Sequence, residues 1–166
     1  MKPGLRLIGL TRGQFSLIDL IYSILQRVGG SEVVCVTWSA GIKDANTVKW
    51  MLDTDLIRKF MLCTDHSYKT RQAKYAVQLS ELFGDENIRT SDVHAKFVLI
   101  RSERLFLTIR TSMNLNANRT CESFEIDESK EIFDFYFGFV RETFGEMPGG
   151  FVTDSATVNR ALDRLS

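Results

Sequence analysis

Residues 94–126 read HAKFVLIRSERLFLTIRTSMNLNANRTCESFEI and hold most of the polar residues that point to a function. Two runs rich in apolar and β-branched residues, 94–101 and 104–113, flank a short polar turn, which predicts a β-hairpin. His94 and Lys96 stand two residues apart at the start of the first run. Because alternate residues of a strand share a face, we expect both side chains to point the same way.

Further hydrogen-bonding residues follow at the end of the second predicted strand. Ser112 and Asn114 are again two apart, and the hairpin would bring them next to His94 and Lys96 at one end of the sheet. An imidazole nucleophile, an ammonium and two neutral hydrogen-bonding groups suit attack on a phosphodiester and stabilisation of its five-coordinate intermediate. Glu122, on the next strand, is placed to hold His94 by one ring nitrogen and leave the other free.

The residues before this stretch alternate between strand and helix patterns. The first strand is expected to be buried, and Gly29-Gly30 should stop the first helix. This order predicts an α/β fold, with a mixed, largely parallel β-sheet flanked by helices on both faces. The strands are expected at 5–10, 32–38, 56–63, 87–92 and 124–126, and the helices at 14–28, 44–52 and 67–83.

A further helix is predicted at 130–146, with Ser129 as its N-cap. Its apolar residues cover an arc of about 200°, against about 100° for a one-sided helix, which indicates burial on two sides or contact with a partner chain. Pro148-Gly149-Gly150 is the one linker-like segment. We therefore expect one domain at 1–147, followed by a linker and a short helix within 148–166.

Composition limits the possible classes of protein. The 166 residues are 44% hydrophobic and 25% charged, with no net charge, which excludes a disordered chain and binding to nucleic acid through bulk positive charge. Three widely spaced cysteines without a CxxC motif suit free thiols in a reducing compartment. Without a membrane-length apolar run or a signal-peptide core, the chain is expected to be cytoplasmic, with no membrane partner. With two histidines and no ligand cluster, no metal site is expected either.

The HxK pair, the TSxN segment and the downstream glutamate together resemble the phospholipase D superfamily, and most closely its small phage- and prophage-associated members. The resemblance implies a mixed sheet between helix layers. No cofactor is expected, because no ligand cluster is present and Lys96 would supply the charge that a metal otherwise provides. The resemblance also implies that single-motif chains form homodimers that bring two motifs together. By the same resemblance, His94 is the nucleophile, Lys96 and the Ser112–Asn114 pair bind phosphate, and Glu122 orients the histidine.

Two positions depart from the family pattern. Arg101 stands where the motif has aspartate, and Thr111 replaces the glycine before Ser112. Arg101 would add a phosphate contact if it faces the groove. Lys69 and Arg71 belong to a basic run that could either contact nucleic acid or form a solvated helix face.

The sequence thus predicts a metal-independent phosphodiesterase, foremost a DNA endonuclease with a site shared across a homodimer. The candidate catalytic residues are His94, Lys96, Asn114 and Glu122, and the candidate substrate-binding residues are Ser112, Thr111, Arg101, Lys69 and Arg71. A degenerate nucleic-acid-binding module is the first alternative. A phospholipid phosphodiesterase ranks last, because no amphipathic helix with a basic face is present.

Overall fold

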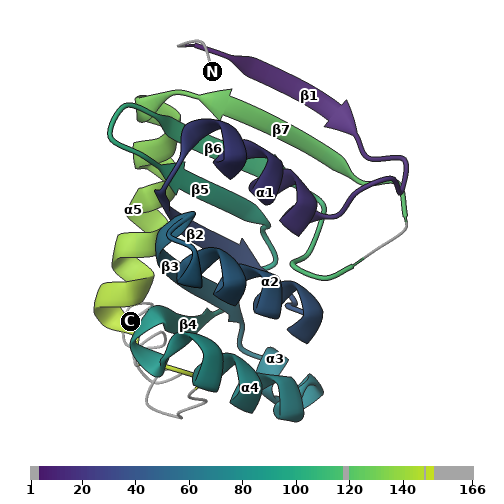
Figure 1. Ribbon diagram of the computed structural model, residues 1–166. Coiled ribbons are helices and arrows are strands. Elements are labelled where there is room, and N and C mark those ends of the chain that lie inside the picture. The colour runs from purple at the N-terminus through teal and green to yellow at the C-terminus, as the bar shows by residue number, and fades with distance from the viewer. Residues whose placement is uncertain (1–3, 118–119, 148, 152–166) are drawn as a thin grey trace, which may run out of the picture.

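The computed structural model describes residues 4–117, 120–147 and 149–151. Figure 1 shows a twisted sheet with α1, α2 and α4 on one face and α5 on the other. The elements are β1 (Arg6–Leu10), α1 (Leu17–Val28), β2 (Ser31–Thr37), α2 (Ile42–Asp53), β3 (Ile57–Asp65), α3 (Tyr68–Arg71), α4 (Ala73–Phe83), a 3₁₀ turn (Asp85–Asn87), β4 (Ile88–Ser91), β5 (Phe97–Arg101), β6 (Phe106–Thr111), β7 (Ser123–Glu128) and α5 (Lys130–Glu146).

Within the described residues the strands form one seven-stranded sheet in the order β1-β7-β6-β5-β2-β3-β4. β2, β3 and β4 are parallel neighbours joined by helical crossovers, whereas β5, β6, β7 and β1 pair antiparallel. Only β5 and β7 run against the other five strands of this sheet. The predicted α/β fold, with a mixed sheet and helices on both faces, is confirmed. The hairpin predicted from 94–113 forms as β5–β6.

The first strand differs from its prediction, because it is not buried. β1 lies at an edge of the sheet and pairs antiparallel with β7, far from β2. Its side chains are largely exposed: Ile8 is 68% and Leu10 63% accessible. A short apolar run carries no information about its pairing partner, and here the partner comes from residues 123–127, more than a hundred positions away.

The core is divided by the sheet into two clusters, and β2 contributes to both. Val33 and Cys35 pack with α1, α2 and α4, whereas Val34 and Val36 pack with α5. Successive side chains of a strand point to opposite faces, so a strand covered on both sides must be apolar at nearly every position. This explains the continuous hydrophobic pattern of β2.

Helix ends follow the sequence closely, with one exception. Ser129 caps α5 by accepting a hydrogen bond from the Ile132 N–H group at 3.3 Å, as predicted. The single helix expected at 67–83 is instead two helices, α3 and α4, because Gln72 leaves the helical region (φ −137°, ψ 46°).

The wide apolar arc of α5 is buried mainly against the sheet, but Phe135 remains 77% exposed.

The chain after α5 packs back onto the domain. Gly150 donates hydrogen bonds to the carbonyls of Asp85 (2.8 Å) and Ile88 (2.9 Å). Phe151 is buried and stacks on Tyr68 with ring centroids 5.4 Å apart. The expected linker therefore contacts the domain at least as far as residue 151, and the helix expected near the C-terminus lies outside the described residues.

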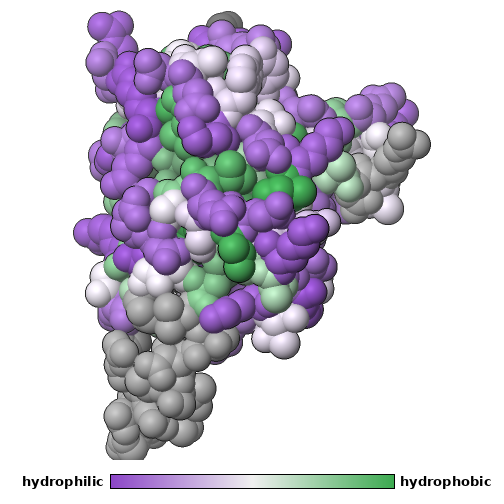
Figure 2. All heavy atoms as spheres, turned by 60° about the horizontal axis from the view of Figure 1, so that its bottom comes forward, coloured by the Kyte–Doolittle hydropathy of each residue, from purple (hydrophilic) through white to green (hydrophobic). Residues whose placement is uncertain are grey.

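The surface is mixed in character. Figure 2, which brings the end of the molecule with α4 and β4 forward, shows small apolar patches separated by polar side chains. Over the part of the chain that the structure describes, no helix is both long and apolar enough to cross a membrane.

Candidate active site

One edge of the sheet gathers the residues singled out in the sequence. The register pairs Val36 of β2 with Phe97 of β5, Phe97 with Arg110 of β6, and Thr111 with Phe124 of β7. The ends of β2 and β6 and the starts of β5 and β7 therefore lie side by side. The connecting segments at this edge carry His94, Lys96, Ser112, Asn114 and Glu122.

His94 and Lys96 lie just before β5 rather than on it, because the strand begins at Phe97. The shared-face argument made from the sequence therefore does not apply to them. The Lys96 ammonium instead donates a hydrogen bond to the carbonyl of His94 at 3.0 Å. The Thr111 N–H group donates to the Lys96 carbonyl at 3.1 Å, which ties the pair to the end of β6.

The exposed His94 imidazole packs against an aromatic ring that follows β2. Its ring centroid is 5.8 Å from that of Trp38, at an interplanar angle of 50°. The Arg71 guanidinium lies 3.8 Å from the Trp38 ring centroid and donates a hydrogen bond to the Trp38 carbonyl at 3.2 Å. Arg71 therefore joins the site through Trp38, whereas Lys69 is exposed on the same short helix.

Ser112 and Glu122 are bound to each other. The Ser112 hydroxyl donates to one oxygen of the Glu122 carboxylate, and the Thr120 hydroxyl donates to the other at 3.0 Å. The backbone of Glu122 is held by Thr11, whose N–H group donates to the Glu122 carbonyl at 2.8 Å. The carboxylate thus has a defined place beside Ser112, and its predicted contact with His94 stays a prediction.

Asn114 connects the loop after β6 to the end of β2. Its Oδ1 accepts a hydrogen bond from the Ser39 N–H group (3.1 Å) and is 3.2 Å from the Thr37 hydroxyl. Thr37 has one hydroxyl proton, which either Asn114 or the Ser39 carbonyl can accept, and its oxygen accepts from the Leu115 N–H group at 3.2 Å. The amide oxygen of Asn114 is therefore used to hold the site together.

Two of the predicted substrate-binding residues, Thr111 and Arg101, make contacts within the fold that differ from the predicted contact with substrate. The Thr111 hydroxyl donates to the Ser123 carbonyl (2.8 Å) and accepts from the Met113 N–H group (3.0 Å), so it shapes the turn after β6. Arg101 lies at the far end of β5, about 17 Å from Lys96 at roughly 3.4 Å per residue. There it pairs with Glu32, so Arg101 does not join the other residues.

Trp38 is one of two residues of the candidate site that the sequence did not reveal. The signal for it was an aromatic residue directly after a buried strand, at the edge where strand ends meet. Thr11, which holds Glu122, was missed as well, because a lone threonine after an edge strand carries no pattern of its own.

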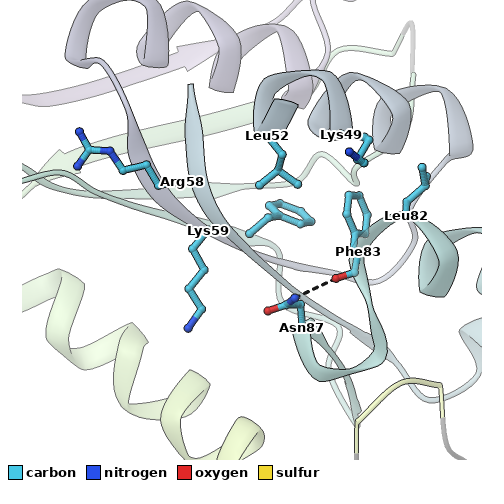
Figure 3. A pocket seen from close by; sticks show the side chains of 8 residues that line it. Lys49, Leu52, Arg58, Lys59, Leu82, Phe83 and Asn87 are labelled. Atoms are coloured by element: carbon cyan, nitrogen blue, oxygen red, sulfur yellow. Dashed lines mark hydrogen bonds between the residues drawn. The ribbon is translucent and has the colours of Figure 1, made fainter. Parts of the chain in front are cut away.

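Other features of the described residues lie away from this edge. Among these residues no group of three His, Cys, Asp or Glu side chains could hold a metal ion. A pocket of about 240 Å³ lies between α2, α4 and the start of β3. Figure 3 shows that its neighbouring cations, Arg58 and Lys59, point away from each other, as expected for adjacent strand residues. They therefore do not converge on one anion.

Comparison with known proteins identifies the fold. No family model and no curated protein matches the chain. The solved structure of NucT from Helicobacter pylori matches with a TM-score of 0.62 at 12% identity, over 87% of this chain and 99% of that one. Nuc from Salmonella typhimurium, a phospholipase D family member, matches with a TM-score of 0.62 at 10% identity, over 87% and 97%.

A third solved structure comes from a different context. TrmBL2, an archaeal chromatin protein described as having a novel mode of DNA binding, matches at 9% identity with a TM-score of 0.53. The match covers 86% of this chain and 53% of TrmBL2. At these identities the three likenesses establish the fold, and the phospholipase D-like fold predicted from the sequence is confirmed.

Proposed function

We propose that this chain is a metal-independent phosphodiesterase that cleaves DNA through a phosphohistidine intermediate. The observation that carries the proposal is a continuous set of contacts at one edge of a sheet with the Nuc fold. It runs from Glu122 to Ser112, from Asn114 to the end of β2, and from there through Trp38 to His94 and Lys96.

In the first step, one ring nitrogen of His94 attacks the phosphorus of the scissile diester. A nitrogen–phosphorus bond forms, the bond to the leaving oxygen breaks, and that oxygen takes a proton from a second imidazole, which starts protonated and becomes neutral. The Lys96 ammonium and the Asn114 amide N–H groups stabilise the charge on the remaining phosphate oxygens. The ammonium donates to the His94 carbonyl at 3.0 Å, so it is held next to the proposed nucleophile.

In the second step, water attacks the phosphohistidine while the second imidazole accepts a proton from it. The nitrogen–phosphorus bond breaks, a phosphomonoester is released, and His94 returns to its starting state. Each chain supplies a single HxK motif, so we assign the second imidazole to His94 of the partner subunit in a twofold homodimer.

Cleavage in the presence of a chelator tests the chemistry directly. Purified protein should cleave single- or double-stranded DNA in excess EDTA at the rate seen without it. Cleavage that disappears in EDTA and returns with magnesium or manganese would show that the mechanism is wrong. Parallel reactions with RNA show whether the protein cleaves DNA, RNA or both.

Subunit mixing tests the shared site. A tagged His94→Ala chain is refolded or exchanged with wild type in equal amounts. If each site needs both histidines, the random mixture keeps about one quarter of the wild-type activity, whereas independent sites keep about one half. Activity near one half, or an active monomer in light scattering, contradicts the shared site.

The role of Glu122 is tested by Glu122→Gln. The amide keeps the size of the carboxylate but removes its charge, and loss of a comparable orienting carboxylate lowers turnover by up to about 10⁴-fold. The variant should fold normally, as measured by circular dichroism, and lose most of its turnover. Full activity would assign the role to another residue.

A second candidate function is nucleic-acid binding without cleavage. Two observations favour it: Arg101 occupies the position of the motif aspartate, and the fold also occurs in the chromatin protein TrmBL2. DNA binding that persists while no condition of pH or cation gives cleavage would support this candidate over the nuclease. The cytoplasmic location, expected from cysteine spacing and apolar patterning, and the phage origin, expected from the family resemblance, remain expectations.

A further inference from the structure

We infer that Trp38 is a positioning residue that fixes the His94 imidazole for attack, and that Arg71 fixes Trp38 in turn. The inference rests on the proposed function for its catalytic part, whereas the contacts themselves are independent of it. Neither the HxK motif nor the resemblance to the phospholipase D superfamily assigns a role to this tryptophan.

The first observation concerns what holds His94. It lies in the segment between β4 and β5 and is exposed to solvent. The Trp38 indole packs beside the imidazole ring, with centroids 5.8 Å apart. Since an exposed loop histidine has several accessible rotamers, packing against a large rigid ring restricts its orientation.

The second observation is that Trp38 is held from two sides. Its carbonyl accepts from Arg71, whose guanidinium also lies over the indole, and Arg71 is in turn fixed by a 2.8 Å hydrogen bond to the Ser67 hydroxyl. On the other side, Asn114 holds the next residue in the chain, Ser39, through its N–H group. The backbone at Trp38 is therefore bound by α3 and by the loop after β6, and its ring packs against Arg71, which limits the positions that the ring can take.

The third observation concerns alternative roles. An aromatic ring beside a phosphodiester site could instead stack on a nucleobase. The Arg71 guanidinium already lies 3.8 Å from the Trp38 centroid, and His94 packs against the same indole. Two side chains thus take up part of the indole surface that a nucleobase would need, which favours a positioning role over base stacking.

The kinetic test compares Trp38→Leu and Trp38→Phe with wild type. Misplacing a reacting group by about 1 Å costs on the order of 10²-fold, so Trp38→Leu should lower kcat by about that factor with little change in KM. Trp38→Phe should restore most of the rate, because it retains a flat ring. Trp50, which lies on α2 against Tyr22, supplies the matched control, and Trp50→Leu should leave both constants unchanged.

The choice of substrate separates the two roles of the ring. Both variants are assayed with DNA and with bis(4-nitrophenyl) phosphate, a diester without a nucleobase. A positioning role predicts the same loss of kcat with both substrates. A rise of KM with DNA alone would overturn the inference in favour of base stacking.

The spectroscopic test does not depend on turnover. The imidazole proton resonances of His94, assigned with a His66→Gln variant, should carry a ring-current shift that Trp38→Leu abolishes and Trp50→Leu leaves intact. Arg71→Met should move the same resonances in part. Resonances unmoved by Trp38→Leu would overturn the inference. If the wild-type protein cleaves no diester, the proposed function fails, the catalytic part of the inference fails with it, and these resonances still decide the contact.

Discussion

Replacing Phe151 by alanine should destabilise the whole domain, although this residue lies beyond the predicted domain boundary. Phe151 is 7% exposed and stacks on Tyr68, itself fully buried at the start of α3. Truncating a buried phenylalanine costs about 3–5 kcal/mol. We expect about 3 kcal/mol for Phe151, at the low end of that range, because the chain end that carries it can relax more easily than a central strand.

Urea unfolding followed by circular dichroism measures this change, and the midpoint of thermal unfolding should fall by roughly 6–12 °C. Phe135→Ala is the matched control. It makes the same chemical change at a side chain that is 77% exposed, and its cost should stay within about 0.5 kcal/mol. Phe151→Leu keeps most of the buried volume and should cost less than about 1.5 kcal/mol.

Equal stability of Phe151→Ala and Phe135→Ala would refute the reasoning, because burial would then not distinguish the two positions. The same result would return the domain boundary to Met147. A loss near 3 kcal/mol, the size expected for a buried ring, would show that the segment after α5 belongs to the folded unit and supports α3, the helix that carries Arg71.

Three other outcomes follow from particular contacts. Asn114→Ala removes the acceptor for the Ser39 N–H group and should lower the unfolding free energy by about 2 kcal/mol in urea titrations, whereas Asn114→Asp, which retains an acceptor, should lose less. A thiol reagent should label Cys121 quickly in the native protein and the two buried cysteines, whose pKa burial raises, only after unfolding. Burial, and then the nearby Asp19 carboxylate, raise the pKa of Asp44 in the folded protein above its ordinary value of 3.8. The folded state therefore favours the neutral acid. The contribution of Asp44 to the unfolding free energy is complete below pH 3.8 and is lost as the pH rises through the pKa of the folded state. Asp44→Asn should therefore melt above wild type at pH 7, and this gap should close in acid; a gap that is constant with pH would contradict the argument.

Local patterns predicted most of the helices and strands, because each depends on residues close together in the chain. The apolar spacing of residues 17–28 and the Ser129 cap determine α1 and α5 through neighbours three and four residues away. The β-branched run at 32–38 likewise predicted the strand that became β2. The break at Gln72 was not predicted, since the residues around it keep a helical pattern.

The candidate site was predicted as a set of residue types and only partly as an arrangement. The HxK and TSxN spacings single out His94, Lys96, Ser112 and Asn114 as candidates, and the structure places all four at one edge of the sheet. The same spacing placed Arg101 in the group, but a strand of this length carries it to the opposite end of the sheet. The spacing of two residues in the sequence does not by itself show whether they lie at the same end of a strand.

Short-range periodicity thus predicts the order of most helices and strands and the β5–β6 hairpin. Motif spacing predicts which polar side chains belong to the candidate site. Long-range packing decides that β1 pairs with β7 at an exposed edge and that Trp38 lies beside His94. It also decides that Thr11 holds Glu122 across a separation of 111 residues. The β1–β7 pairing and the contacts of Trp38 and Thr11 depend on which distant segments of the chain come together in the folded protein. Such contacts form through burial and hydrogen bonding between remote parts of the chain, which leave no periodic trace in its sequence.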